Sequence, residues 1–272
     1  MNLRICIGGV TGWTGSALAK AVLDEPDLEL SGAVARKSKG EDAGQAIGRP
    51  GIGLTVEGSV EAALKDGTTD VYIDYTHPSS VKGNVLAALK AGVPAVIGTS
   101  GLSAADYDEI AAAAKAKGLG VVASGNFSLT AALLQRFALM AAKHVPDFEI
   151  IDYAKHTKPD VPSGTARELA ERLGRIAPNR PGVAIEQLSG PKETRGANIS
   201  GGRVHSVRLP SFVLSAEVIF GMSGERLTLR HDAGTSAEPY VGGTLLAARR
   251  VVNLRGLVRG LDTLLFGELS GG

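Results

Sequence analysis

One short segment of this sequence combines a lysine with a helix start of the kind that binds anions. Lys158 is followed, after four residues, by Ser163, Gly164 and Thr165, and then by a run rich in Ala, Glu, Leu and Arg. A serine that begins a helix leaves the next backbone N–H groups available to a ligand, and the helix dipole adds positive potential. Because Lys158 supplies a full positive charge nearby, we expect a carboxylate-binding site here.

A second segment, near the start of the chain, has the glycine spacing of a phosphate loop. Gly9, Gly12 and Gly15 lie three residues apart, between an apolar run and an amphipathic one. Glycine lets the backbone turn sharply and approach a pyrophosphate, whose charge rests on the first N–H groups of the helix. The segment predicts a dinucleotide site, and a tight structural turn is the alternative. The residues expected at this loop are Gly9, Thr11, Gly12, Trp13, Thr14 and Gly15.

The end of the second predicted strand indicates which dinucleotide binds. A carboxylate at this place would accept the 2′-hydroxyl of NAD, but the sequence reads VARKSKG, with Arg36, Lys37 and Lys39. Cations favour a 2′-phosphate, so NADPH is the expected cofactor and NADH the alternative. The other interpretation is a solvated loop whose charges bind nothing.

Two later strand ends are expected to border the nicotinamide, since ligands of open α/β sheets gather at the carboxyl ends of the strands. His77 has three interpretations: a catalytic group, a residue that lines the cofactor, or part of a turn before a helix that starts at Ser79 or Ser80. The residues expected at these two ends are Asp74, Thr76, His77, Thr99 and Gly101.

The elements that must position these groups follow from hydrophobic periodicity. From residue 3 to about 127, short β-branched runs alternate with amphipathic runs, which predicts a Rossmann domain with a doubly wound parallel sheet. Beyond residue 148 the β-rich runs predict an α+β domain over residues 128–237, with an open mixed sheet covered by helices on one face. Residues 238–272 are helical in period and are expected to pack on the first domain, residues 1–127.

Composition narrows the class of protein. The chain has 272 residues, 44% of them apolar, and a net charge of +1, which gives no reason to expect a nucleic acid as partner. The one cysteine, Cys6, lies in an apolar run, so it is expected to be a core residue in a reducing compartment. No run of 18 apolar residues occurs. We expect a cytoplasmic protein with a small-molecule ligand, no membrane span and no metal.

The segments GGVTGWTG, DYTHPSSV, IGTSG, SGNFSLTAALL and KPDVPSGTA, in this order, resemble the dihydrodipicolinate reductase family. The resemblance implies a Rossmann domain, a mixed-sheet domain that builds a homotetramer, and a last helix that returns to the first domain. It also implies hydride transfer from NADPH or NADH to a cyclic imino dicarboxylate, 4-hydroxy-tetrahydrodipicolinate, with loss of water, in lysine and diaminopimelate biosynthesis.

The resemblance also implies roles for individual residues. Arg36 matches the basic residue at the ribose phosphate, and Lys158 matches the active-site lysine, with Ser163 to Thr165 as a carboxylate clamp. Asn126 and Phe127 match the hinge between the domains. The further residues expected to bind cofactor on this ground are Gly98, Thr99, Ser124, Asn126 and Phe127.

The sequence departs from the family at the place of the proton donor. Family members typically carry two histidines where this chain has Ala154 and Lys155. On an extended strand His156 would share the face of Ala154 and Lys158, so His156 is one candidate donor, and Lys155 or Lys158 is the other.

Two other departures keep alternative functions open. Trp13 replaces an arginine of the phosphate loop, and FVLSAEVIFG replaces a Gly-Glu-His tract, leaving His205 and Arg208 as nearby polar candidates. The first alternative is a paralogous reductase of another imino acid. The second is an NADP-binding protein without catalysis.

Overall fold

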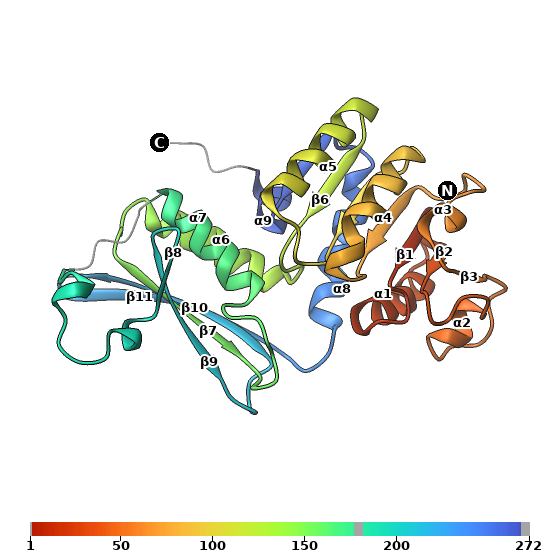
Figure 1. The fold of residues 1–272 in the computed structure, drawn as a ribbon. Coiled ribbons are helices and arrows are strands. Elements are labelled where there is room, and N and C mark those ends of the chain that lie inside the picture. Colours follow the sequence, from red (N-terminus) through yellow and green to blue (C-terminus); the bar gives the residue numbers. More distant parts are fainter. Residues whose placement is uncertain (1, 177–181, 268–272) are drawn as a thin grey trace. The chain divides into compact units, whose positions relative to one another are not determined.

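The computed structural model describes residues 2–176 and 182–267, which form two compact units (Figure 1). The first unit contains the described residues up to Ser128 together with Ala237–Gly267, and the second contains the described residues of Leu129–Ser236. The segment Ala237–Gly267 therefore returns to the first unit.

The first unit is built on a seven-stranded sheet in the order β12-β6-β5-β4-β1-β2-β3. Every pairing in it is parallel. The chain moves from β1 to β2 on one side and later to β4 on the other, so the topological switch point lies between β1 and β4. The strands are β1 (Leu3–Gly8), β2 (Leu28–Val34), β3 (Val56–Glu57), β4 (Val71–Asp74), β5 (Ala95–Ile97), β6 (Gly120–Ala123) and β12 (Gly256–Arg259).

Helices form two packed rows on this sheet. One row contains α1, α8 and α9, and the other contains α3, α4 and α5. Because crossover connections are right-handed and the strand order reverses at the switch point, the two rows cover opposite faces. The helices of this unit are α1 (Trp13–Asp24), α2 (Ala43–Ala46), α3 (Val60–Ala63), α4 (Pro78–Lys90), α5 (Ala104–Lys117), α8 (Glu238–Val251) and α9 (Leu261–Phe266).

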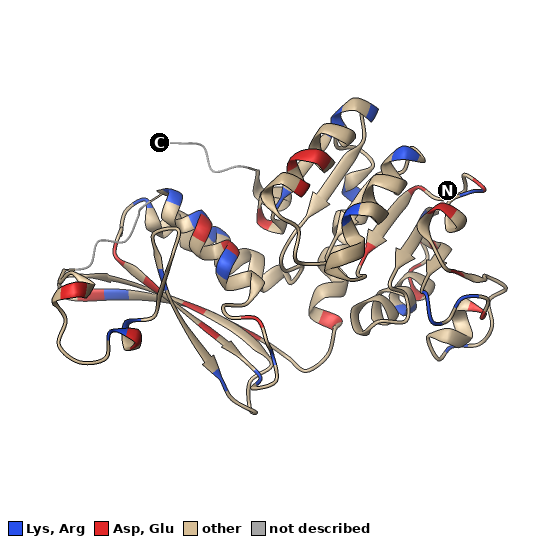
Figure 2. Ribbon diagram, in the orientation of Figure 1, with Lys and Arg blue, Asp and Glu red and all other residues tan. Residues whose placement is uncertain are grey.

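Local sequence chemistry sets the helix ends, as α5 illustrates. The Ser103 hydroxyl accepts from the N–H of Asp106 at 3.2 Å, and the Asp106 carboxylate accepts from the N–H of Ser103 at 2.9 Å. This capping box satisfies two donors that the helix itself cannot satisfy. The helix stops at Gly118, whose φ of 65° is left-handed. Figure 2 shows cationic and anionic positions mixed along α7, whereas α5 has its anionic positions in its first half and its cationic positions in its last turn.

Cys6 lies in the core of the first unit, which confirms that it is a core residue. Cys6 has no exposed surface, and burial raises the pKa of its thiol to about 12. Tyr72 and Ile73, from the adjacent strand β4, are equally buried. The central strands are apolar on both faces because helices cover both, as the predicted parallel sheet requires.

The second unit contains a five-stranded mixed sheet in the order β11-β10-β7-β9-β8. β7 pairs in parallel with β9, and the other pairings are antiparallel. Along β7, Phe148, Ile150, Asp152 and Ala154 are buried while the alternate residues are not, because α6 and α7 cover one face (Figure 1). The elements are α6 (Leu129–Ala142), β7 (Phe148–Ala154), α7 (Gly164–Ile176), β8 (Ala197–Ile199), β9 (Gly202–Arg208), β10 (Leu214–Met222) and β11 (Glu225–Ala233), with 3₁₀ turns at Ile185–Gln187 and Lys192–Arg195.

The expectation of one helical segment over residues 238–272 is wrong for residues 256–259, which form a strand. α8 ends at Val251, and residues 256–259 form β12, an edge strand that pairs with β6. Gly256 and Gly260 have φ values of 81° and 89°, which end helical structure on both sides of Leu257 and Val258. The apolar residues of this segment have a helical period, but between the two glycines only a segment as short as a strand remains. Across the described ranges, each helix is either too short or too polar to cross a membrane.

Candidate cofactor and carboxylate sites

A cavity of about 760 Å³ opens in the first unit at the carboxyl ends of β1, β2, β3 and β4. This is the side of the switch point at which α/β sheets bind ligands. Seven of the residues predicted from the sequence line it: Gly9, Thr11, Gly12, Arg36, Lys37, Thr76 and His77. The other lining residues, which sequence reasoning missed, are Val34, Ala35, Gly58, Ser59, Tyr75, Ser80 and Asn84.

The glycine loop fits a pyrophosphate. Gly12 is the N-cap of α1 and provides no side-chain cap, so the first N–H groups of the helix stay available to an anion. Gly9 has a φ of 77°, and a Cβ there would lie 2.2 Å from the carbonyl oxygen of Tyr75. A Cβ on Gly15 would lie 2.1 Å from the carbonyl oxygen of Gly9. Glycine is therefore sterically required at both places.

The end of the cavity that follows β2 is cationic. Arg36 and Lys37 follow β2, line the cavity and are exposed. The Lys39 side chain lies against Gly58, where an added Cβ would come within 3.0 Å of its Cδ. The described residues lining this cavity include no carboxylate. The charges present suit a phosphorylated ribose better than a free 2′-hydroxyl.

His77 begins α4 with its own side chain. Its Nδ1 accepts from the N–H of Ser79 at 3.2 Å, and Pro78 is the first helical residue. The expected helix start at Ser79 or Ser80 is therefore wrong by one or two residues. The reason is that proline suits the first helical position, where a missing N–H costs nothing.

The remaining predicted cofactor residues are not among the described residues that line the cavity. A Cβ on Gly98 would lie 2.1 Å from the Tyr75 ring, so Gly98 lets that ring pack against β5. The Ser124 hydroxyl donates to the carbonyl of Asn126 at 2.7 Å, which fixes the turn after β6. Trp13 is 59% exposed and its ring lies edge-on to Tyr240, 5.8 Å between centroids. The others outside the lining are Thr14, Gly15, Thr99, Asn126 and Phe127.

In the second unit, Ser163 caps α7 as expected. Its hydroxyl accepts from the N–H of Ala166 at 3.4 Å, and the helix begins at Gly164. The N–H of Ser163 donates to Oδ2 of Asp152 at 2.9 Å, a carboxylate of the neighbouring strand β7. Ser163 and Thr165 are buried, while Gly164 is partly exposed. The start of the helix is thus anchored to the sheet.

The predicted geometry of His156 is wrong. β7 ends at Ala154, and the N–H of Lys158 donates to the carbonyl of Lys155 at 3.0 Å, which closes a turn. Because the chain turns, His156 does not alternate with Lys158 as it would on a strand, and Lys155 and His156 are exposed. Lys158 is partly buried, and its Nζ lies 2.8 Å from Oδ1 of Asp160.

The structure separates the two polar candidates of β9. An Arg208 guanidinium nitrogen donates to the carbonyl of Asp160 at 2.9 Å, so Arg208 holds the loop that carries Lys158. The imidazole Nε2 of His205 lies 2.7 Å from a carboxylate oxygen of Glu149, away from that loop. Of the two residues, Arg208 is the one that contacts the loop containing Lys158.

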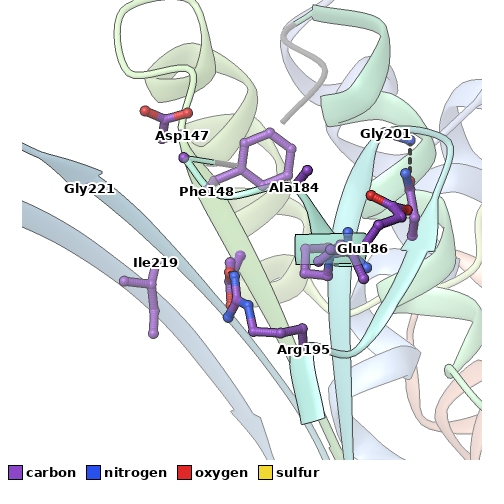
Figure 3. A pocket seen from close by; sticks show the side chains of 13 residues that line it. Asp147, Phe148, Ala184, Glu186, Arg195, Gly201, Ile219 and Gly221 are labelled. Atoms are coloured by element: carbon purple, nitrogen blue, oxygen red, sulfur yellow. Dashed lines mark hydrogen bonds and ion pairs between the residues drawn. The ribbon is translucent and has the colours of Figure 1, made fainter. Parts of the chain in front are cut away.

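A second cavity of the same unit, about 810 Å³, contains none of the predicted residues (Figure 3). Arg195, which lines it, pairs with Glu149, and Glu149 also accepts from His205. Burial acts to raise the pKa of Glu149, but the hydrogen bonds from Arg195 and His205 outweigh burial and lower it. Arg195, His205 and Glu149 are therefore engaged with one another.

A doubly wound sheet with a glycine loop at its switch point, together with a second, mixed-sheet unit in the same chain, is typical of oxidoreductases that bind a pyridine nucleotide. The family model described as "Dihydrodipicolinate reductase, N-terminus" matches residues 3–127, and "Dihydrodipicolinate reductase, C-terminus" matches residues 130–265. The chain therefore belongs to the dihydrodipicolinate reductase family.

Relatives similar over almost the full length support this assignment. The chain is 38% identical to the 4-hydroxy-tetrahydrodipicolinate reductase of Desulfitobacterium hafniense, over 97% of this chain and 99% of that protein. It is 38% identical to the Moorella thermoacetica reductase of the same name, over 97% and 98%. A dipicolinate-bound dihydrodipicolinate reductase from Paenisporosarcina sp. TG-14 has the same fold, with a TM-score of 0.82, 29% identity, and coverage of 97% and 100%.

Proposed function

We propose that this protein reduces 4-hydroxy-tetrahydrodipicolinate, with NADPH as the preferred cofactor, in lysine and diaminopimelate biosynthesis. One observation carries the proposal. A chain that matches the reductases over its whole length combines a dinucleotide cavity in its first unit with Lys158 and a capped helix start in its second. When bound, NADPH supplies a hydride; the substrate also takes up one proton and loses one water.

Each unit contributes its own part of the site. The helix start at Gly12 holds the pyrophosphate, and Arg36 with Lys37 holds the 2′-phosphate. In the second unit, Lys158 and the N-terminus of α7 at Gly164 bind a substrate carboxylate. Holding the reacting groups in place converts an encounter of two molecules into a reaction within one complex.

The proton donor is a lysine or histidine of the turn after β7. Lys155 and His156 are exposed there, and Lys158 follows them. Ala154, at the family's usual histidine position, is buried and has no group to give a proton. Ala154 is also the observation that favours the second candidate function, reduction of a different imino acid at the same carboxylate site.

The decisive experiment follows the nicotinamide absorbance of purified protein with NADPH and freshly made 4-hydroxy-tetrahydrodipicolinate. Turnover at ordinary enzymatic rates, about 1–1,000 per second, supports the proposal. Turnover with other imino acids alone supports the paralogous reductase, and cofactor binding without oxidation of NADPH by any imine would exclude catalysis. The homotetramer and the cytoplasmic location stay predictions, which gel filtration with light scattering and cell fractionation test.

A further inference from the structure

A fully buried carboxylate lies at the end of β4, beside the cofactor cavity. Asp74 is the last residue of that strand and has no exposed surface. Two of its hydrogen-bond partners, Thr76 and Asn84, line the cavity. Burying a carboxylate is costly unless hydrogen bonds replace its water, so the way this one is satisfied is informative.

Five hydrogen bonds converge on the Asp74 carboxylate. Oδ1 accepts from the N–H of Thr76 at 3.0 Å, from its hydroxyl at 2.8 Å, and from the hydroxyl of Thr99 at 2.6 Å. Oδ2 accepts from the Tyr72 hydroxyl at 2.6 Å and the Asn84 amide at 3.0 Å. Burial, and after it the charge of Asp74, raises the pKa of Tyr72 well above its usual value, so this hydroxyl keeps its proton and donates.

These bonds join two strand ends. Thr76 follows β4, Thr99 follows β5, and the N–H of Thr76 also lies 2.8 Å from the Thr99 hydroxyl. Asp74 therefore fixes the backbone after β4 relative to the end of β5. All five bonds come from neutral donors, so none of them places a positive charge beside the carboxylate.

The strand order indicates which half of the dinucleotide lies near Asp74. The helix start at Gly12 follows β1, and Arg36 with Lys37 follows β2, on one side of the switch point. If the adenosine phosphate lies on that side, the nicotinamide half extends to the other side, over the ends of β4 and β5. This is where Asp74 holds Thr76 and Thr99.

We propose that Asp74 is a positioning residue of the nicotinamide end, which fixes Thr76 and Thr99 and supplies a negative charge that favours the cationic nicotinamide ring of the oxidised cofactor over the neutral ring of the reduced one. A fixed charge in a dry site acts more strongly than in water and needs no rearrangement when positive charge develops on the ring. The inference rests on the proposed function, since it requires a nicotinamide in this cavity.

The test compares dissociation constants of NADP⁺ and NADPH for the full chain, followed through the fluorescence of its single tryptophan, Trp13, or by calorimetry. Asp74→Asn should weaken NADP⁺ binding about fivefold more than NADPH binding, the effect of one charge at roughly 8 Å in a medium of intermediate polarity. Thr99→Val is the matched control, because it removes a hydrogen bond to the same oxygen and leaves the charge. It should weaken both forms equally.

A second variant keeps the test decisive if Asp74→Asn does not fold. Asn84→Lys replaces the amide that donates to Oδ2 of Asp74 with an ammonium group. The added positive charge then offsets the negative charge of the carboxylate. It should shift the NADP⁺ to NADPH affinity ratio in the same direction. An unchanged ratio in either folded variant would overturn the inference. Failure of the proposed function would look different, because the wild-type chain would then not bind NADPH or not oxidise it with any imino acid.

Discussion

Arg208 places Nη2 2.7 Å from Oδ2 of Asp152, a carboxylate with no exposed surface. The same oxygen accepts from the N–H of Ser163, and Arg208 also donates to the carbonyl of Asp160. Together the pair fastens the loop with Lys158 at two points to the underlying strands β7 and β9. This anchoring holds Lys158 and the start of α7 in place before any ligand binds, which lowers the entropic cost of binding.

Asp152→Asn should therefore lower both stability and substrate affinity. Removing one partner of a buried ion pair leaves the other charge uncompensated. This should lower the free energy of unfolding by about 3 kcal/mol. The KM for the imino substrate should rise while the dissociation constant of NADPH is unchanged, because the cofactor cavity belongs to the other unit. Denaturant unfolding, kinetics and cofactor titration measure these quantities.

The matched control for this variant is Glu217→Gln. Glu217 pairs with Arg230 at 3.1 Å on the same sheet, but the Arg230 side chain is 40% exposed. Such a pair contributes at most about 1 kcal/mol, so the control should lose little stability and no substrate affinity. Equal effects of the two variants would mean that the Asp152 pair has no special relation to the loop.

Lys158→Ala should reduce kcat/KM by about two orders of magnitude, the roughly 3 kcal/mol of a charge-assisted hydrogen bond to the substrate carboxylate. NADPH affinity should not change. Lys117→Ala removes an equal charge from α5 of the first unit and should leave activity unaltered. If Lys158→Ala weakened NADPH binding as much as it reduced turnover, the carboxylate-site assignment would be wrong. Steady-state kinetics and cofactor titration decide this.

Arg36→Ala should weaken NADPH binding about tenfold, the loss of one charge-assisted contact with the 2′-phosphate, and leave NADH binding nearly unchanged. Calorimetric titration of both cofactors measures the ratio. Arg49→Ala is the control, since Arg49 pairs with Asp24 and is not among the described lining residues of the cavity. A parallel loss of NADH affinity in Arg36→Ala would contradict recognition of the phosphate.

Gly15→Ala should distort the glycine loop, because the added Cβ would lie 2.1 Å from the carbonyl oxygen of Gly9. Overpacking of this kind costs about 1–3 kcal/mol, and cofactor affinity should fall with it. Gly83→Ala is a helical control with nothing within 4 Å of the new methyl group, so it should gain about 0.5–1 kcal/mol. Thermal unfolding with and without NADPH separates the two effects.

Stability should fall when the pH drops through about 6.5, because burial lowers the pKa of His231 in the second unit. Below that pH the unfolded chain takes up a proton that the folded chain takes up only at lower pH. This proton uptake stabilises the unfolded state and lowers the free energy of unfolding. The slope from one group is at most about 1.4 kcal/mol per pH unit. Nδ1 of His231 contacts the Thr130 hydroxyl at 3.0 Å, and His231→Phe should flatten the slope measured by denaturant unfolding between pH 7 and 5. A slope identical to that of the wild type would show that other groups cause it.

The sequence alone determined the features that depend on neighbouring residues. The glycine spacing at Gly9 to Gly15, the cations after β2 and the serine at the start of α7 were all readable, because turns and helix caps follow local backbone rules. Alternation of strands and helices likewise indicated the parallel sheet. The same local rules misjudged residues 256–259, whose strand conformation depends on pairing with β6.

Only the tertiary structure decided which distant groups meet. Asp152 and Arg208 are 56 residues apart, and no period or spacing relates them until β7 and β9 pair in parallel. Asp74 likewise meets Thr99 only because β4 and β5 are neighbours. Sequence patterns record which face a residue occupies, but strand order and register set which buried groups satisfy one another. The two carboxylates that anchor the candidate sites are therefore products of the fold.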